Sequence, residues 1–384
     1  MDFDLTKEQQ LLNDAVQRFV GKEYSFAARE ATLDSKEGWS REIWAKLAEL
    51  GLLGLQVPEE HGGMGGANVE TMLTMNALGR GLLLEPYLPS AILATALIRD
   101  LGSPAQKEEL LPAMAAGERI AVPAHVEPGA RDDLARVATT AARSGDGFVL
   151  NGRKAVVLHA AAADALLVSA RTSGGPVDPR GISLFIVPRG APGVSLQTYR
   201  TLDGQRASDV SLRDIRVPAG GLLGPEGGAF EAIRAAWDLG IAAICAEAAG
   251  ALQALLDSTV EYAKTRKQFG VPIGKFQALQ HRMVEMLIHV EQARSMSYLA
   301  AIRATDPDPA ERRRAVSAAK VVIGQACRKV AQEAVQIHGG MGMTDELHVG
   351  HYFKRLTAIE LSLGDTEHHL ESFARETAAR KEIA

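Results

Sequence analysis

The chain has 384 residues, of which 46% are hydrophobic and 23% are charged, and its formal net charge is -5. This length suits two or three domains with a full apolar core. The acidic balance argues against a protein that binds nucleic acid without sequence preference, because such proteins carry an excess of basic residues. Nucleic-acid binding is therefore not expected.

Cysteine usage and the first residues bear on the cellular setting. Cys245 and Cys327 lie far apart in apolar helical patterns. This disfavours a disulfide framework or a cysteine-built metal site, and fits a reduced cytoplasmic setting. The start, MDFDLTKEQQ, is acidic and polar, unlike a secretory signal. No run approaches the ~18 to 20 apolar residues of a membrane span. We expect a cytoplasmic protein with no membrane segment and no metal.

The first ~118 residues show the apolar spacing of helices and clear start signals. Thr6 and Gln9 predict a capping box, and Ser40 predicts an N-cap. Ser103–Gln106 repeats the start signal with a proline at the first helical position. The loop at 58–66 is too rich in glycine to be helical.

The spacing of apolar residues changes in the middle of the chain. From Ile120 to about Gly221 apolar and polar residues alternate, and segments with the composition of turns separate the alternating runs. Strands are predicted at 148–150, 165–170, 182–187, 194–196 and 210–217. Several short strands without helices between them favour a compact antiparallel β domain. The helical period returns from about Glu226, with breaks near 270–274, 306–309 and 339–342. The sequence thus predicts an α+β fold with an N-terminal α-helical domain (1–118), a middle antiparallel β domain (119–225) and a C-terminal α-helical domain (226–384).

Two segments of the last third have features of a ligand site. In Glu261–Gln277, EYAKTRKQFGVPIGKFQ, Arg266 and Phe269 place a cation and an aromatic ring before a turn rich in glycine and proline. This pairing suits an anionic, flat ligand such as a nucleotide diphosphate, although a solvated helix end with a buried aromatic has the same composition. In Gln336–Gly342, paired glycines either admit a ligand close to the backbone or simply cap the helix.

With these segments in this order, the α–β–α plan resembles the flavin-dependent acyl-CoA dehydrogenases from end to end. The matching motifs are TRKQFGVPIGKFQALQ (265–280), QIHGGMG (336–342), EPGA (127–130), NGRK (151–154) and PEEHGGMGG (58–66). The resemblance implies the fold of that family, with a C-terminal four-helix bundle, and an oxidoreductase that uses FAD to desaturate an acyl-CoA thioester.

The resemblance also implies how such a site is built. A glutamate removes the proton next to the thioester carbonyl while a hydride passes to the flavin. Each FAD is shared between subunits, with its ring held by the β domain of one chain and its ADP half by the C-terminal helices of a neighbour.

Carried over residue by residue, the ADP-binding half looks intact. Arg266 and Gln268 match the residues that reach the pyrophosphate and ribose, and Phe269 matches the packing aromatic. The other FAD-binding residues implied by the resemblance follow the turn or lie in the second segment: Gln277, Gln336, Gly339 and Gly340.

The half that would hold the flavin ring departs from the family pattern. Val126 replaces the threonine of threonine-glutamate-proline, and Arg131-Asp132 replaces a glycine-serine pair. After NGRK the usual tryptophan-isoleucine-threonine is Val156-Val157-Leu158. These side chains can neither donate a hydrogen bond nor stack as an indole does.

Neither position at which the family places its catalytic glutamate holds a residue that can accept a proton. Leu363 occupies one, and Gly240, followed by Ile241, occupies the other. Weak candidates for a relocated base are Glu360, about one helical turn before Leu363, and Glu247, roughly 10 Å along the helix from Gly240.

His368 and His369 could form an acid/base pair, but solvated surface residues are the better reading of this polar helix. Three functions remain open. The first is the non-catalytic subunit of a heteromeric acyl-CoA dehydrogenase, resembling the small subunit of bacterial pimeloyl-CoA dehydrogenases, which completes the FAD site of a catalytic large subunit. The second is a self-sufficient, homo-oligomeric dehydrogenase or oxidase with a relocated base. The third is a non-enzymatic relative such as the DNA-binding branch, against which the net charge of -5 counts.

The resemblance implies three kinds of partner. These are the catalytic large subunit, an acyl- or dicarboxylyl-CoA thioester, and electron-transferring flavoprotein as the electron acceptor.

Overall fold

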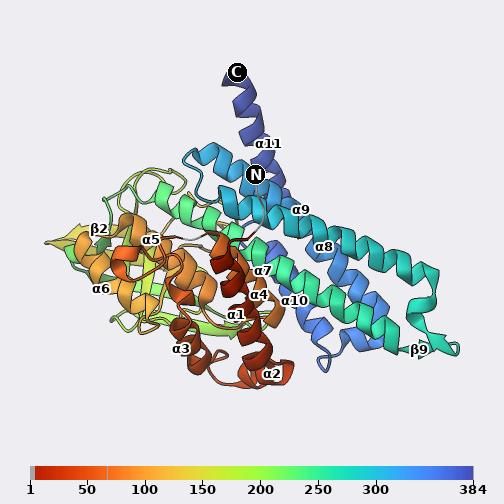
Figure 1. The fold of residues 1–384 in the computed structure, drawn as a ribbon. Coiled ribbons are helices and arrows are strands. Elements are labelled where there is room, and N and C mark those ends of the chain that lie inside the picture. Colours follow the sequence, from red (N-terminus) through yellow and green to blue (C-terminus); the bar gives the residue numbers. More distant parts are fainter. Residues whose placement is uncertain (1–4, 67, 384) are drawn as a thin grey trace. The chain divides into compact units, whose positions relative to one another are not determined.

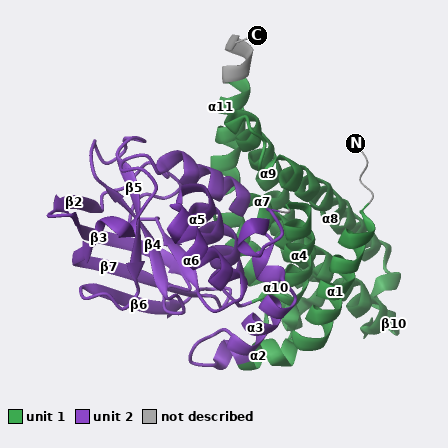
Figure 2. Cartoon of the chain, turned by 60° about the vertical axis from the view of Figure 1, so that its left-hand side comes forward, with its two compact units in different colours: residues 1–31, 68–83, 241–384 green, residues 32–67, 84–240 purple. Residues whose placement is uncertain are grey.

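The computed structural model describes residues 5–66 and 68–383, so the first four residues of the predicted acidic start lie outside the described residues. Its helices and strands are labelled in Figure 1. The chain forms two compact units (Figure 2). The first comprises residues 1–31, 68–83 and 241–384, and the second comprises residues 32–67 and 84–240. The three-domain division at residues 118 and 225 stays a prediction.

The second unit contains the large sheet, with strand order β6-β7-β3-β2-β4-β5-β8 and β1 paired to β4. The strands are β1 (Ala121–Ala124), β2 (Thr140–Ser144), β3 (Gly147–Leu158), β4 (Ala165–Arg171), β5 (Ile182–Pro188), β6 (Val194–Arg200), β7 (Arg206–Val217) and β8 (Leu222–Leu223). Each predicted run lies inside a strand. Most pairings are antiparallel as predicted, but β1 and β2 both pair with β4 in parallel.

Strands β1 and β2 escaped prediction for physical reasons. β1 has only four residues and includes Pro123, and proline weakens a strand signal because it cannot donate to the ladder. β2 is exposed at all but one position, so it lacks the alternation that marks a half-buried strand.

The predicted helix starts are confirmed. Thr6 with Gln9, and Ser103 with Gln106, exchange the two hydrogen bonds of a capping box. The Ser40 hydroxyl accepts from the Ile43 backbone. The helices of the second unit include α3 (Arg41–Glu49), α5 (Thr95–Leu101), α6 (Pro104–Ala115) and the π-helix η3 (Tyr87–Ala94), with short turns η1 (Leu52–Gly54), η2 (Glu59–His61) and η4 (Ala219–Gly221). Most of α2 (Phe26–Asp34) belongs to the first unit.

The turn η2 corrects the prediction that the loop at 58–66 has no helical part. It is a single 3₁₀ turn of three residues, which begins after Pro58 and ends at Gly62 in a left-handed conformation. So short a turn forms between flanking glycines because it needs only one or two backbone hydrogen bonds.

The first unit is helical. It contains α1 (Lys7–Glu23), α4 (Asn68–Gly81), most of α7 (Phe230–Thr265), α8 (Gln277–Arg303), α9 (Pro309–His338), α10 (His348–Leu361) and α11 (Thr366–Ile383). All three predicted breaks are confirmed. They hold the hairpin of β9 (Lys267–Gln268) and β10 (Val271–Pro272) with the turn η5 (Ile273–Lys275), the N-cap Asp308, and the turn η6 (Gly339–Met343).

The prediction that no apolar run approaches the length of a membrane span is wrong for helix α7. It contains an 18-residue window with a mean hydropathy of 1.8, which is long and apolar enough to cross a membrane. However, 89% of that window is buried inside the protein, as in the core helix of a globular protein. Cys245 in α7 and Cys327 in α9 are free thiols that are buried, as their apolar surroundings predicted.

Helices α4 and α7 approach each other at two glycines. A Cβ on Gly79 would lie 2.1 Å from the Glu247 carbonyl oxygen, and one on Gly250 would lie 1.8 Å from the Asn76 carbonyl oxygen. Both distances are far inside contact range, so the two backbones touch where only glycine fits.

Replacing Gly250 by alanine is therefore expected to destabilise the first unit by about 3 kcal/mol, because the new methyl group meets backbone that cannot move aside. Gly21→Ala on α1 is the matched control, since a Cβ there meets no described atom within 4 Å. That control should gain about 0.5–1 kcal/mol from helix propensity. Urea denaturation measures both variants, and equal stabilities would contradict the close approach.

Candidate functional site

The segment that carries Arg266 forms a hairpin at the end of α7. Val271 lies opposite Gln268, and the two turn residues, Phe269 and Gly270, have φ angles of 54° and 78°. Two successive left-handed residues are typical of the tight turn that matches the twist of a hairpin. The sequence therefore folds locally into a rigid tip rather than a frayed helix end.

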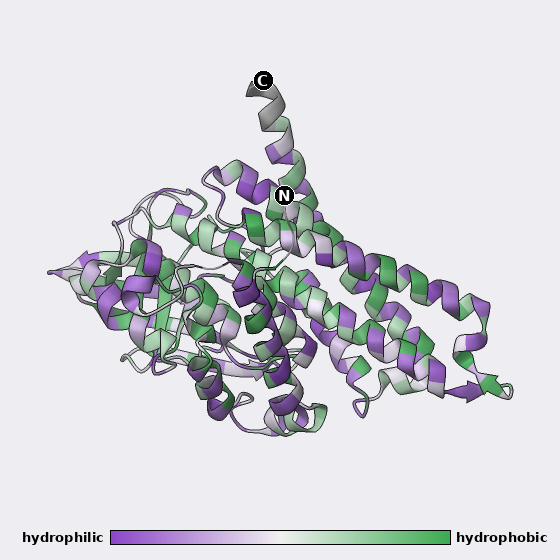
Figure 3. Cartoon of the chain, viewed as in Figure 1, coloured by the Kyte–Doolittle hydropathy of each residue, from purple (hydrophilic) through white to green (hydrophobic). Residues whose placement is uncertain are grey.

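Phe269 is 92% exposed at this tip, and Figure 3 shows hydrophobic and hydrophilic residues side by side there. Its described ring contact is with Phe276, edge to face, with 6.0 Å between centroids. The alternative of a helix end with a buried aromatic is thus wrong. Arg266, Gln268 and Gln277 are also exposed, and the Gln268 amide donates to the Lys267 carbonyl at 2.8 Å.

The second segment ends α9 and opens η6. Gln336, Gly339 and Gly340 are exposed. Gly339 has φ 61° and ψ -142°, a conformation that favours glycine. A Cβ on Gly339 or Gly340 would meet no described atom within 4 Å. The backbone is therefore open to a ligand on this side.

One contact brings the two segments to the same end of the first unit. The Tyr262 ring stacks on the His338 ring at 4.2 Å with 26° between the planes, and the Tyr262 hydroxyl donates to the His338 carbonyl at 3.4 Å. Tyr262 lies one helical turn before Arg266, and His338 directly precedes Gly339. His338 Nδ1 donates to the Ala334 carbonyl at 2.8 Å, and burial lowers the pKa of His338.

This end has the chemistry that the ADP half of FAD requires. An exposed arginine suits a pyrophosphate, an exposed ring suits packing against a flat group, and glycine backbone lets a ligand approach. The residues present therefore fit that half of the cofactor.

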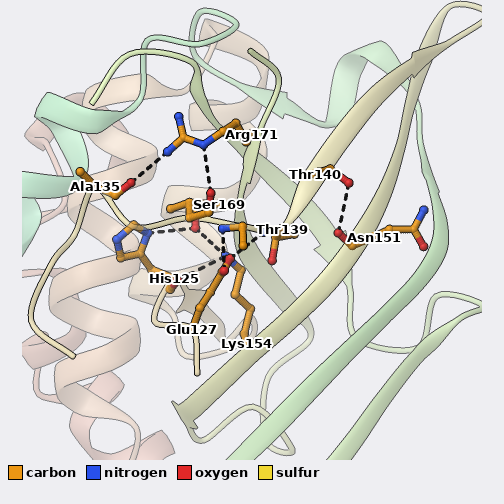
Figure 4. Close-up of polar contacts among 11 residues, drawn as sticks. His125, Glu127, Ala135, Thr139, Thr140, Asn151, Lys154, Ser169 and Arg171 are labelled. Carbon is orange, nitrogen blue, oxygen red and sulfur yellow. Dashed lines mark hydrogen bonds and ion pairs between the residues drawn. The ribbon is translucent and has the colours of Figure 1, made fainter. Parts of the chain in front are cut away.

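The EPGA and NGRK motifs meet inside the second unit (Figure 4). The buried Glu127 carboxylate accepts from Lys154 Nζ at 2.7 Å and from the backbone of Ala138 and Thr139 at 2.7 and 3.0 Å. Lys154 Nζ also donates to the His125 carbonyl at 3.2 Å and to the Ser169 hydroxyl at 3.0 Å. The ion pair is satisfied internally, so its role is to hold β3 against the EPGA segment.

Burial and partners act against each other on the pKa values of this pair. Burial would raise the pKa of Glu127, but the Lys154 ammonium and the hydrogen bonds outweigh it and hold that pKa below its usual value. Burial lowers the pKa of Lys154 to about 8, opposed by the attraction of Glu127.

Arg171, at the end of β4, was missed from the sequence. Its guanidinium donates to the carbonyls of Val137 and Ala135, both at 2.9 Å, and to those of Asp178 and Arg180 at 2.9 and 3.0 Å. It thereby anchors the chain that follows EPGA. The available signal was an arginine at the end of the mostly apolar run ALLVSAR.

The residues at the flavin-ring positions do not fit the ring. Val156 sits in a β-bulge with φ 52°, its side chain is 53% exposed, and its backbone N–H is already donated to Asp209 Oδ1 at 3.1 Å. Val157 is buried and Leu158 is half-buried. The Val126 carbonyl accepts from the Ala155 N–H at 2.8 Å. None of the four side chains is a hydrogen-bond donor.

The two glutamate positions are likewise built without a base. Gly240 is buried in α7. Leu363 has φ 57° and lies in the turn between α10 and α11, where its carbonyl accepts from His369 Nε2 at 2.9 Å. His369 is only 3% exposed, and burial lowers its pKa to about 3. The prediction that this histidine is solvated is therefore wrong, because it ties the turn to α11.

The relocated-base candidates are engaged in structural contacts. Glu360 Oε1 accepts from the Thr366 hydroxyl at 2.8 Å, the Thr366 N–H at 3.3 Å and Arg328 at 3.0 Å, so it caps α11. Since α10 ends at Leu361, the predicted one-turn helical spacing from Glu360 to Leu363 is wrong. The Glu247 carboxylate accepts one hydrogen bond from Nε and one from Nη2 of Arg355, at 2.6 and 2.7 Å. Each carboxylate is held by an arginine inside the fold.

The fold, with the EPGA, NGRK and arginine motifs, is that of a family of flavoprotein oxidoreductases that act on acyl thioesters. Comparison with known proteins shows that the chain belongs to the acyl-CoA dehydrogenase family, whose members are FAD-dependent oxidoreductases. Models of the family's N-terminal, middle and C-terminal domains match residues 6–118, 124–215 and 229–378.

Individual relatives match over nearly the whole chain. The probable acyl-CoA dehydrogenase YngJ of Bacillus subtilis is 32% identical over 372 residues, covering 96% of this chain and 97% of that protein. The structure of butyryl-CoA dehydrogenase from Megasphaera elsdenii matches with a TM-score of 0.90 at 28% identity, over 98% of this chain and all of that one. A chain of the ChsE4-ChsE5 complex from Mycobacterium tuberculosis matches with a TM-score of 0.88 at 29% identity, over 98% and 99%.

The polar cluster of the second unit predicts a pH dependence of stability. His125 is 4% exposed, with its Nδ1 2.9 Å from the Ser169 hydroxyl. Burial lowers the pKa of His125 to about 3, and nearby Lys154 acts in the same direction. The unfolded chain takes up this proton near pH 6.5 and the folded chain does not. The free energy of unfolding is therefore unaffected by His125 above pH 6.5, and His125 lowers it by about 2 kcal/mol on acidification to pH 5.

His125→Gln should remove about that much of the acid-induced loss, which urea denaturation at pH 7, 6 and 5 measures. His61→Gln is the matched control, because His61 lies in the same unit in a partly exposed turn. The prediction fails if the two variants lose stability equally as the pH falls.

Proposed function

We propose that this chain is the non-catalytic subunit of a heteromeric FAD-dependent acyl-CoA dehydrogenase. One observation carries the proposal. The residues that resemble the family's ADP-binding set are exposed at one end of the first unit, while the positions that resemble its flavin-ring and base positions carry Val126, Val156, Leu158, Leu363 and Gly240.

In this role the chain's own residues bind and orient the ADP portion of FAD. Arg266 and Gln268 hold the pyrophosphate and ribose of an FAD whose ring lies on a catalytic large subunit. Phe269 packs against the nucleotide, and Gln277, Gln336, Gly339 and Gly340 line its path. FAD supplies the hydride acceptor when bound, and the large subunit supplies the glutamate that removes the substrate proton.

The comparisons support an assembly of unlike chains. The Mycobacterium tuberculosis relative is, by its name, a complex of two components. Butyryl-CoA dehydrogenase and YngJ carry the names of acyl-CoA dehydrogenases. We propose an acyl- or dicarboxylyl-CoA thioester as the substrate of the complex, electron-transferring flavoprotein as its electron acceptor, and a cytoplasmic setting.

The alternative of a self-sufficient dehydrogenase with a relocated base gains no support from the geometry. Glu360 caps α11 and Glu247 holds Arg355. Both carboxylates are buried and are engaged by an arginine, so these contacts would have to break before either could reach a substrate. The non-enzymatic alternative has no observation in its favour.

The central test is reconstitution with a family member that carries the glutamate missing here. Purified alone, this chain is expected to retain little FAD and to show no dehydrogenase turnover with a dye acceptor and an acyl-CoA series. Co-expressed with its large subunit, it should form a flavin-loaded, active complex. Full flavin loading and turnover by the single chain would refute the division of labour.

Within that complex, Arg266→Ala should weaken FAD retention about tenfold or more, the effect of losing a charge-assisted hydrogen bond. Lys264→Ala is the matched control, because Lys264 lies two residues earlier, is also exposed and pairs with Glu261. Flavin absorbance after gel filtration at falling protein concentration measures retention. Equal retention by the two variants would remove Arg266 from the site.

Glu360→Gln separates a structural carboxylate from a catalytic one. The substitution should lower the melting temperature of the complex, because it weakens the cap of α11 and leaves Arg328 without its buried partner. The turnover per bound FAD should stay within about twofold of the wild-type value, since an uninvolved residue contributes nothing to the barrier. A loss of a hundredfold or more, with FAD still bound, would restore the relocated base.

A further inference from the structure

A groove of about 510 Å³ lies inside the first unit, lined by residues of α1, α4 and α8 together with Leu5. It is separate from the ADP half-site. Gln277 opens α8, whereas Arg294 of the groove lies 17 residues further on, about 25 Å along the helix. The volume falls within the range of small-molecule sites, about 300–1,000 Å³.

The lining of the groove is mixed. Met72 and Leu73 of α4, which are 4% and 6% exposed, provide its apolar part together with Leu5. The polar residues of the lining are Asn13, Gln17, Asn76, Arg294, Ser295, Ser297 and Tyr298. The groove thus offers a small apolar surface among hydrogen-bonding groups.

The cation of the groove is Arg294. Its side chain is 61% exposed, and its nearest described carboxylate oxygen, Glu291 Oε1, is 3.5 Å away. At that distance the hydrogen bond is weak, so the guanidinium keeps most of its donors for another anion. Glu291 also disfavours a dianion, because a second negative charge would meet a like charge beside the mouth.

We propose that this groove binds a small aliphatic carboxylate, with the alkyl chain against Met72 and Leu73 and the carboxylate on Arg294. A monoanion matches one arginine with a carboxylate beside it, and a short alkyl chain matches the apolar part of the lining that methionine and leucine form. At such a site the concentration of a free aliphatic acid would control how much of the first unit is stabilised by bound ligand. It is independent of the proposed role in the dehydrogenase.

Octanoate is the probe, titrated by calorimetry into the full chain and into the complex with its large subunit. Saturable binding with one site per chain is expected in both. Arg294→Gln should weaken it at least tenfold. Arg303→Gln is the matched control, because Arg303 lies on the same helix, pairs with Asp306 and does not line the groove; it should change binding less than twofold.

A second variant and a second ligand distinguish binding at this site from nonspecific binding. Ser295→Trp places a large ring at the exposed mouth and should abolish binding, with an unchanged melting temperature as the check on folding. Octylammonium has the same number of carbon atoms and the opposite charge, and should bind at least tenfold more weakly. The proposal is overturned by unchanged binding in Arg294→Gln, by equal affinity for octylammonium, or by loss of octanoate binding when the large subunit covers the groove.

Discussion

The stack of Tyr262 on His338 is the contact on which the candidate site depends. It joins the end of α7 to the end of α9, and so brings two segments that are about 70 residues apart in sequence to one end of the first unit. Without it Arg266 and Gly340 would sit on separate helix ends, and neither segment alone distinguishes a nucleotide site from an ordinary helix terminus. The hydrogen bond from His338 Nδ1 to the Ala334 carbonyl fixes the plane of the imidazole against which the tyrosine packs.

The second unit shows that a conserved-looking motif can be structural. Glu127 and Lys154 carry the two motifs most typical of the family in the β domain, yet they are spent on each other and on the backbone around them. Removing either would leave a buried charge without its partner, which costs about 3–5 kcal/mol. The pair therefore has a structural role in the second unit that does not depend on a flavin ring.

The sequence could predict features that depend on residues close together in the chain, but not those that depend on residues far apart in the chain. Capping boxes and short apolar runs bounded by turn residues are local signals, so Thr6, Ser103 and the run at 182–187 were predicted correctly. The burial of His369 and the engagement of Glu360 depend on Ser317, Arg328 and Thr366, which approach only in the folded chain. The open glycines and the exposure of Phe269 are also products of folding, so the sequence could name these residues but not decide their use.

Phe269 makes the strongest physical case for a partner. A non-glycine residue in the left-handed region costs roughly 1–2 kcal/mol, and here that residue also exposes 92% of an aromatic side chain to water. Both features are unfavourable in the isolated chain, and the hairpin around them is otherwise well paired. Strain of this kind persists where a functional contact offsets it. A flat nucleotide held by another subunit would cover the ring and use the turn that projects it.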